Sequence, residues 1–160
     1  MRVIVFPDKQ ANQPKSSKEC QMVNKHCPEK EAQEIGSTLV LLELHGCNNL
    51  IKNPRTLKKR IRELVEEKMV IRKTGQDQWE HGAISFILFL AESHVYVETW
   101  PENNYIKVHV HICNYTRNNR SKAEKLAADI AKLAGATGVE AWSIQGGPIS
   151  PLKVLSEKPF

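Results

Sequence analysis

A glutamate and a serine stand side by side at positions 92 and 93, at the end of a nearly continuous apolar run that starts at Ile84. A serine hydroxyl is a weak nucleophile unless the backbone holds it at an attacking angle and a neighbouring group manages its proton. A strand that ends at Glu92-Ser93 could hold the hydroxyl in this way, and the chain then returns to a cysteine, Cys113. We therefore interpret residues 85–113 as a functional site and not merely as part of a core.

The chain that follows the Glu-Ser pair predicts a β-hairpin. Residues 94–100 and 105–113 both alternate between apolar and polar types, and residues 101–104 form a turn signal between them. In the second segment the even-numbered residues would face the core and the odd-numbered residues would form a polar face. If the two segments pair as antiparallel strands, Glu98 lies opposite Lys107, and a one-residue slip would destroy this polar face.

The remaining segments predict an α+β protein. Further strands are expected at residues 38–44, at 69–73 as a weak strand closed by a turn at 75–77, at 82–92 and at 139–144. The order of strands and helices favours a two-layer α/β sandwich, in which the helices cover one face of a mainly antiparallel sheet.

Two helices are predicted from their capping residues and apolar stripes. The first begins at Asn53-Pro54, a capping residue followed by proline, and its stripe consists of Leu57, Ile61, Leu64 and Val65. The last begins at Asn119 or Ser121, ends at Gly135 or Gly138, and has a stripe of Leu126, Ile130 and Leu133.

The length and composition favour one globular domain with two appendages. With 160 residues, of which 41% are hydrophobic, the chain can bury one sizeable core but not two. We expect a flexible N-terminal extension at 1–36, a folded domain at 37–146 and an irregular C-terminal tail at 147–160. No apolar run reaches the length of a membrane span or of a signal peptide, which predicts a cytoplasmic protein.

The charges and cysteines indicate neither nucleic acid nor a metal. The net charge of +5 comes from basic residues that are mostly interleaved with acids, which is typical of a solvated surface. The four cysteines lack paired Cys-x-x-Cys spacing, so reduced thiols are expected. Cys20, His26 and Cys27 lack a fourth ligand at suitable spacing, and we predict no metal there.

Three short elements carry a resemblance to a known family. AESH at 91–94, TWPE at 99–102 and a cysteine twenty residues after Ser93 resemble the bacterial and archaeal S-adenosylmethionine decarboxylase proenzymes, over about residues 38–135. Gly46 and Cys47 add to the likeness, although Cys47 is interpreted as a packed structural thiol. The resemblance implies that Ser93 attacks the carbonyl of Glu92, and that elimination then cleaves the chain into residues 1–92 and 93–160. It also implies that Ser93 becomes a pyruvoyl cofactor.

The resemblance implies roles for further residues at matching positions. Ser85 matches a serine that assists processing, and Cys113 matches the cysteine that returns a proton to the substrate carbanion. Trp79 matches an aromatic residue that stacks on adenine, and Trp100 and Glu102 match positions that contact the nucleoside. Taken singly, each has an ordinary explanation, because tryptophans are common core residues and a free cysteine is usually a small buried hydrophobe.

One position departs from the family pattern. Where the family has a histidine that handles a proton during processing, this chain has Glu98, and a carboxylate is a weaker base than an imidazole near neutral pH. We hypothesise that His109 or His111, on the same polar face, takes over that role. Alternatively, Lys107 pairs with Glu98 and the histidines are only polar surface. The trio His109, His111 and Cys113 also resembles a metal site, but we expect no metal.

The function predicted from this resemblance is decarboxylation by a self-made pyruvoyl group. The first substrate is S-adenosylmethionine, whose product would feed spermidine synthesis, and the resemblance implies a homodimer of processed protomers. Arginine or ornithine is an alternative substrate of the same chemistry. A second alternative is a homologue that is never processed and binds a ligand or a partner subunit without catalysis. Met22 could be the true start in place of Met1, because the resemblance begins only near Thr38.

Overall fold

Alternating apolar residues build one antiparallel sheet whose core lies under two helices. A computed structural model describes residues 36–114, 117–147 and 150–159. The strands are β1 (Ser37–His45), β2 (Lys73–Gln78), β3 (Ile84–Phe89), β4 (His94–Trp100), β5 (Tyr105–Cys113), β6 (Gly138–Gly147) and β7 (Ser150–Pro159). The helices are α1 (Pro54–Glu66) and α2 (Arg120–Ala134), with short 3-10 turns η1 (Asn49–Lys52), η2 (Glu80–Gly82) and η3 (Pro101–Asn103).

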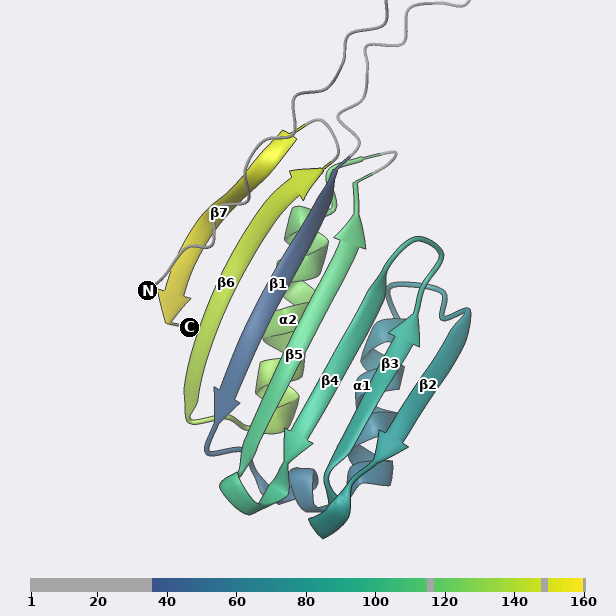
Figure 1. Cartoon of the computed structure of the whole chain (residues 1–160), viewed down its shortest axis with the longest axis vertical. Coiled ribbons are helices and arrows are strands. Elements are labelled where there is room, and N and C mark those ends of the chain that lie inside the picture. The colour runs from purple at the N-terminus through teal and green to yellow at the C-terminus, as the bar shows by residue number, and fades with distance from the viewer. Residues whose placement is uncertain (1–35, 115–116, 148–149, 160) are drawn as a thin grey trace, which may run out of the picture. The chain divides into compact units, whose positions relative to one another are not determined.

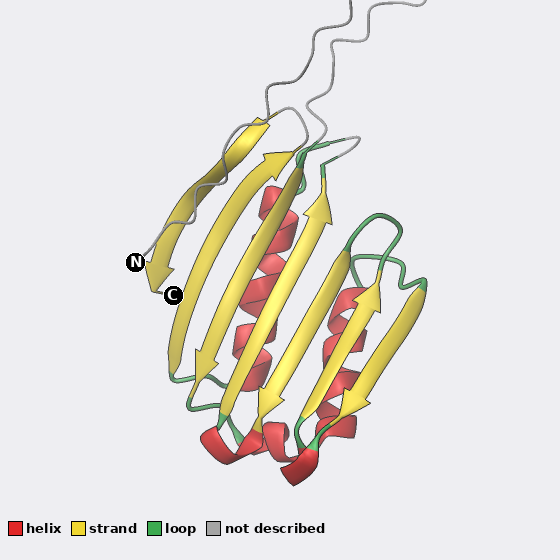
Figure 2. Cartoon of the chain, viewed as in Figure 1, coloured by secondary structure: helices red, strands yellow, loops and turns green. Residues whose placement is uncertain are grey.

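The seven strands form a single sheet in the order β2-β3-β4-β5-β1-β6-β7, and all neighbouring pairs are antiparallel. Both helices lie on the same side of this sheet, α1 behind β3 and β4 and α2 behind β1 and β5 (Figure 1, Figure 2). The predicted α+β sandwich with helices on one face is therefore confirmed.

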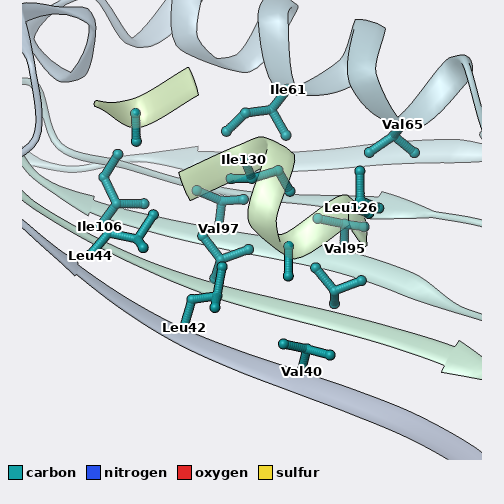
Figure 3. Close-up of a cluster of buried hydrophobic side chains, with 14 of the residues drawn as sticks. Val40, Leu42, Leu44, Ile61, Val65, Val95, Val97, Ile106, Leu126 and Ile130 are labelled. Atoms are coloured by element: carbon teal, nitrogen blue, oxygen red, sulfur yellow. The ribbon is translucent and has the colours of Figure 1, made fainter. Parts of the chain in front are cut away.

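The core lies between the sheet and the two helices (Figure 3). Every second residue of β1, β4 and β5 is buried there, as the alternation predicted, and the helices contribute their apolar stripes. Members of this cluster are Val40, Leu42, Leu44, Ile61, Val65, Val95, Val97, Ile106, Leu126 and Ile130. This packing fixes the strand register, because a shift by one residue would turn the apolar side chains to the opposite face.

The helix ends follow the predicted capping residues in part. The side chain of Asn53 accepts a hydrogen bond from the Thr56 amide at 3.1 Å, and Pro54 is the first helical residue, as predicted. α2 ends at Gly135, which has a left-handed φ of 58°. Asn119 precedes α2, but its side chain makes no capping bond and instead donates to the Cys113 carbonyl at 2.7 Å.

Two elements at the edges of the sheet differ from the sequence predictions. The weak strand predicted at 69–73 is wrong, since β2 starts only at Lys73 and runs through the predicted turn at 75–77. Met69 and Ile71 pack against the core from outside any strand, whereas the polar residues of β2 are held by backbone pairing with β3. The irregular tail predicted at 147–160 is also wrong, because β7 pairs with β6 there. At a sheet edge only one side of a strand is paired, so the prolines of this segment are compatible with a strand.

Smaller differences concern strand lengths and the N-terminus. The strand predicted at 82–92 is confined to Ile84–Phe89, and the one predicted at 139–144 extends over Gly138–Gly147. The expected flexible extension lies outside the described residues except for Gly36, as do Cys20, His26 and Cys27. In the part of the chain that the structure describes, no helix is long and apolar enough to cross a membrane.

The face of the sheet opposite the helices is not covered by any described element (Figure 1). We call it the open face. Half-buried side chains of β3, β4 and β5 project from it, namely Ser85, His94, Tyr96, Glu98, Lys107, His109, His111 and Cys113. The polar face predicted from the alternation of residues 105–113 is part of this open face.

Candidate functional site

The Glu92-Ser93 bond lies in the β3–β4 hairpin, at the end of the sheet where β5 also ends (Figure 1). The hairpin is closed by the Leu90 amide, which donates to the Ser93 carbonyl at 2.9 Å. The Cys113 backbone N–H donates to Ser93 Oγ at 3.0 Å, and the Cys113 thiol donates to the Glu92 carbonyl at 2.5 Å. Cys113 therefore contacts both the candidate nucleophile and the carbonyl that it would attack.

Two histidines lie beside this bond on the open face. His94 and His111 are opposite each other in the β4–β5 register, and their ring centroids are 4.9 Å apart. Burial lowers the pKa of both imidazoles, and for His111 the neighbouring His94 lowers the pKa further. His111 Nδ1 is buried and has no hydrogen-bond partner among the described residues. We call Glu92, Ser93, His94, His111 and Cys113 the nucleophile end of the open face.

A pocket lies at the other end of the open face, next to η2 and η3. Its lining comprises Trp79, Glu80, Ala83, Ser85, Glu98, Thr99, Trp100 and Glu102. Trp79 is 59% exposed, and its Nε1–H donates to Ser85 Oγ at 3.0 Å. The predicted substrate-contacting residues therefore lie together in one pocket with Ser85 and Glu98. We call this group, with Tyr96 and His109, the pocket end.

Glu98 lies opposite Lys107, which confirms the predicted register of the hairpin. The alternative in which these two residues form an ion pair is wrong, because Lys107 Nζ pairs with Glu43 of β1 at 3.4 Å. Glu98 Oε1 instead accepts a hydrogen bond of 2.6 Å from the Tyr96 hydroxyl. Sequence reasoning missed Tyr96, although it has the same parity in β4 as Glu98 and was therefore expected on the same face.

His109 belongs to the Glu98 group, whereas His111 belongs to the Ser93 group. His109 is opposite Tyr96, and the two rings meet edge to face with centroids 5.6 Å apart. Burial lowers the pKa of His109, and Glu98 acts in the opposite direction by favouring the charged imidazole. Among the described residues, no three His, Cys, Asp or Glu side chains are close enough to hold a metal ion together.

Ser93 and Glu98 do not meet within one chain. They are five residues apart along one extended segment, which at about 3.3 Å per residue separates them by roughly 16 Å. The structure thus brings Ser93 to Cys113, and Ser85 to Trp79 and Glu98, but it leaves the two groups at opposite ends of the sheet.

The two thiols in the described residues have different environments. Cys47 is buried, donates to the Leu44 carbonyl, and has a pKa raised to about 11 by burial, as suits a structural thiol. Cys113 is only half-buried and lies against the Glu92-Ser93 bond. Only the second is placed to take part in chemistry there.

Comparison with known proteins gives one consistent family. The family model described as S-adenosylmethionine decarboxylase matches residues 38–145. The S-adenosylmethionine decarboxylase proenzyme of Thermomicrobium roseum is 35% identical over 81 residues, which cover 49% of this chain and 69% of that protein. The proenzyme of a Thermoanaerobacter species is 27% identical over 128 residues, covering 73% and 94% of the two chains.

The proenzyme of Acetivibrio thermocellus is 30% identical over 76 residues, and the chain spans 61% of its length. The crystal structure of the adenosylmethionine decarboxylase from Aquifex aeolicus superposes with a TM-score of 0.61 at 18% identity, covering 69% of this chain and 89% of that one. At this identity the superposition shows a shared fold.

Proposed function

The chain belongs to the S-adenosylmethionine decarboxylase family, and we propose that it is a proenzyme that cleaves itself at Glu92-Ser93 and then decarboxylates S-adenosylmethionine. The observation that carries this proposal is the contact of Cys113 with both sides of the Glu92-Ser93 bond. The product would feed spermidine synthesis, and we expect the enzyme to act in the cytoplasm.

Cleavage begins at the nucleophile end. Ser93 Oγ attacks the Glu92 carbonyl carbon, the carbon–nitrogen bond breaks, and the hydroxyl proton passes to the released nitrogen of residue 93, so that the amide becomes an ester. The Cys113 amide, 3.0 Å from Ser93 Oγ, supports this step by orienting the hydroxyl. The Cys113 thiol donates to the Glu92 carbonyl oxygen and polarises the bond under attack.

The ester is then opened by elimination. A base removes the Cα proton of residue 93, the electron pair forms a Cα–Cβ double bond, and Glu92 leaves as a new C-terminal carboxylate. Water replaces the nitrogen of residue 93, ammonia leaves, and a pyruvoyl group remains. The residues present fit such a group, because the backbone N–H and the thiol of Cys113 both lie against residue 93 and could contact a carbonyl formed there. Once formed, the pyruvoyl group supplies the electron sink for loss of the substrate carboxylate.

The pocket end is the candidate substrate site. Two tryptophans provide aromatic faces for a planar base, and aromatic faces also attract a cationic centre such as a sulfonium. Glu102 provides a carboxylate to accept hydrogen bonds from sugar hydroxyls. The relatives compared above are all named for S-adenosylmethionine, so we do not propose arginine or ornithine. Cys113 is the proposed donor of the proton that replaces the lost carboxylate.

A second copy of the chain would bring the two ends together. Within one chain the pocket is lined by residues of η2, η3 and the end of β4 next to η3, whereas Ser93 precedes the other end of β4. If two open faces stack with their strands antiparallel about a two-fold axis, the pocket end of one copy lies over the nucleophile end of the other. Half-buried apolar side chains of β1 and β6, such as Leu39, Leu41 and Ile144, line the open face beside the polar residues and support such stacking.

The base for elimination has to replace the family histidine at position 98. We propose that His109 or His111 supplies the imidazole, with Ser85 assisting as in the family. Replacing each histidine with alanine and measuring the rate of cleavage tests this assignment. Unchanged cleavage in both variants would contradict it.

Intact-mass spectrometry of the purified protein tests the function as a whole. We expect two fragments, residues 1–92 and residues 93–160, the second carrying a pyruvoyl N-terminus, followed by release of carbon dioxide from S-adenosylmethionine. A single uncleaved chain after prolonged incubation would contradict the proposal and favour a homologue that binds without catalysis. This second outcome is worth testing because Glu98 stands where the family has the histidine that handles a proton during processing.

A further inference from the structure

We propose that Tyr96, Glu98 and His109 act as one unit in self-cleavage, in which His109 takes the Cα proton, Glu98 stabilises the resulting imidazolium, and Tyr96 is the positioning residue that holds Glu98. This inference rests on the proposed self-cleavage and deepens it, because it selects one of the two candidate histidines and adds a residue that the family resemblance does not provide. The unit would do with three side chains what the family does with a histidine at position 98.

The first observation is that the position of the Glu98 carboxylate is determined by Tyr96. The hydroxyl of Tyr96 donates to Glu98 Oε1 at 2.6 Å, and both side chains project from β4 onto the open face. The cation directly opposite, Lys107, is bound to Glu43 on the neighbouring strand. In the described part of the chain, Tyr96 is therefore the only residue that hydrogen-bonds to the Glu98 carboxylate.

The second observation is that Tyr96 remains a hydrogen-bond donor at neutral pH. Burial raises the pKa of its hydroxyl, and the hydrogen bond to Glu98 raises it further, while a weaker contact with Ser85 lowers it. A protonated phenol next to an ionised carboxylate forms a charge-assisted hydrogen bond, which is stronger and shorter than a neutral one. Ser85, whose hydroxyl accepts a hydrogen bond from Trp79, is opposite Glu98 in the β3–β4 register.

The third observation is that the carboxylate is close to one histidine and not to the other. His109 is directly across from Tyr96, and Glu98 favours its charged form, whereas Lys107 and His94 disfavour it. On β1 the residue directly opposite His109 is Leu41, which carries no charge, and Glu43 on the same face is bound to Lys107. His111 is opposite His94 and is influenced by His94 and by burial, with no effect of Glu98. A proton taken up on this face is therefore best stabilised on His109.

The proposed step is the removal of the Cα proton from the ester. In the stacked pair of chains proposed above, the Cα–H bond of residue 93 in one copy breaks and the proton binds the neutral imidazole of His109 in the other copy. The electron pair forms the Cα–Cβ double bond as the Glu92 carboxylate leaves. The imidazolium later returns the proton to water. No oxidant or reductant is needed, because the products differ from the ester only by this elimination.

The test follows cleavage of freshly synthesised full-length precursor over time, in a cell-free translation, with single and paired substitutions. H109N is expected to slow cleavage roughly 100-fold, the usual contribution of a general base. E98Q and Y96F are each expected to slow it roughly tenfold, the effect of one hydrogen bond to a charged group. Y96F added to E98Q should slow cleavage less than about twofold further, because residues of one unit are not additive.

The decisive experiment restores histidine, the family residue, at position 98. In an E98H background, H109N and Y96F should each slow cleavage less than about threefold, since an imidazole then stands at position 98. H111N is the matched control on the same strand and face, and any effect it has should be equal in both backgrounds. A merely structural role of Tyr96 would not depend on the residue at position 98.

Several outcomes would overturn the inference. It is wrong if the H109N precursor is cleaved at a rate within about twofold of the parent rate. It is also wrong if Y96F slows cleavage by the same factor in the parent, E98Q and E98H backgrounds. E98Q keeps the shape of the side chain and an acceptor for Tyr96, so it tests the charge even if Y96F reduces folding, which circular dichroism of the purified variants would reveal. If the parent protein is not cleaved, the proposed function itself is wrong. If the parent protein is cleaved and the variants are cleaved at the same rate, only the proposal that Tyr96, Glu98 and His109 act as one unit is wrong.

Discussion

The two ends of the open face are held together by different kinds of contact. At the nucleophile end both interactions with the Glu92-Ser93 bond come from Cys113, one from its backbone amide and one onto a backbone carbonyl. At the pocket end the interactions join side chain to side chain, Trp79 to Ser85 and Tyr96 to Glu98. The first arrangement depends on strand register and on two side chains, Ser93 and Cys113, whereas the second depends on side chains at both ends of each contact.

This difference suggests where the chemistry can change during evolution. The backbone partner in each Cys113 contact survives any substitution that keeps the hairpin in register, whereas Ser93 and Cys113 have to keep their own side chains. A network of side chains can exchange a histidine for a carboxylate if a neighbour compensates. The departure from the family pattern at Glu98 lies at the pocket end, while AESH and Cys113 at the nucleophile end match it.

The largest effect is expected from removing the nucleophile. S93A leaves the Leu90–Ser93 backbone hydrogen bond in place but removes the hydroxyl that is proposed to attack the Glu92 carbonyl. We expect no fragments at all by intact-mass spectrometry. The matched variant S85A changes a serine of the pocket end, 3.0 Å from the Trp79 indole, and should slow cleavage without abolishing it. Fragments from S93A would show that the cut lies elsewhere.

The second prediction distinguishes the role of the Cys113 backbone amide from the role of the Cys113 thiol. C113A keeps the amide that donates to Ser93 Oγ but loses the Sγ–H. We expect cleavage to continue at a reduced rate, while decarboxylation by the cleaved protein falls by roughly 10²–10⁴, the range for loss of a general acid. Cleavage is followed on gels and decarboxylation by release of carbon dioxide. If C113A is not cleaved at all, the nucleophile end depends on the side chain and the contrast between the two ends is lost.

The parts of the fold that the sequence predicted are those in which local pattern and packing agree. Strict alternation in residues 105–113 was enough to predict which side chains are buried and that Glu98 faces Lys107. The edge strands β2 and β7 were not predicted, because backbone pairing with an inner strand holds them and their own side chains carry little apolar pattern.

The site was predicted where it depends on one hairpin and was missed where it depends on distant segments. The approach of Ser93 to Cys113 follows from the pairing of β4 with β5. The partner of Lys107 could not be inferred, because Glu43 comes from β1, more than sixty residues away in sequence. Ser93 and Glu98 are only five residues apart in sequence, but along an extended strand this spacing separates their side chains.

The third prediction concerns substrate binding at the pocket end alone. E102Q removes a charge from the pocket lining without touching any residue of the nucleophile end. We expect the KM for S-adenosylmethionine to rise roughly tenfold, as for loss of one charge-assisted hydrogen bond, with cleavage unchanged. Steady-state kinetics of the fully cleaved protein measure the first effect, and a time course of precursor cleavage measures the second. A loss of cleavage in E102Q would mean that the pocket is needed for processing as well as for substrate.

The smallest effect is expected from the histidine pair beside Ser93. Burial lowers the pKa of His94 and His111 in the folded protein, so the unfolded chain binds protons more readily than the folded chain once the pH falls below about 6.5. Stability should therefore decrease as the pH is lowered from 7 towards 5. The double variant H94N/H111N should lose part of this dependence, a difference of about 2–4 °C in melting temperature at pH 5.

Thermal melts of the uncleavable S93A protein at pH 7 and pH 5, with and without the two substitutions, isolate this contribution from processing. H81N is the matched control for the replacement of a histidine by asparagine, because His81 lies in the exposed turn η2, away from the nucleophile end. H94N/H111N could reduce the pH dependence of the melting temperature and leave the cleavage rate of the protein that retains Ser93 unchanged. In that case the histidines of the nucleophile end affect stability only, and the proton is transferred by residues of the pocket end. If cleavage falls in parallel, His111 shares in the chemistry and the two ends are less distinct than their contacts indicate.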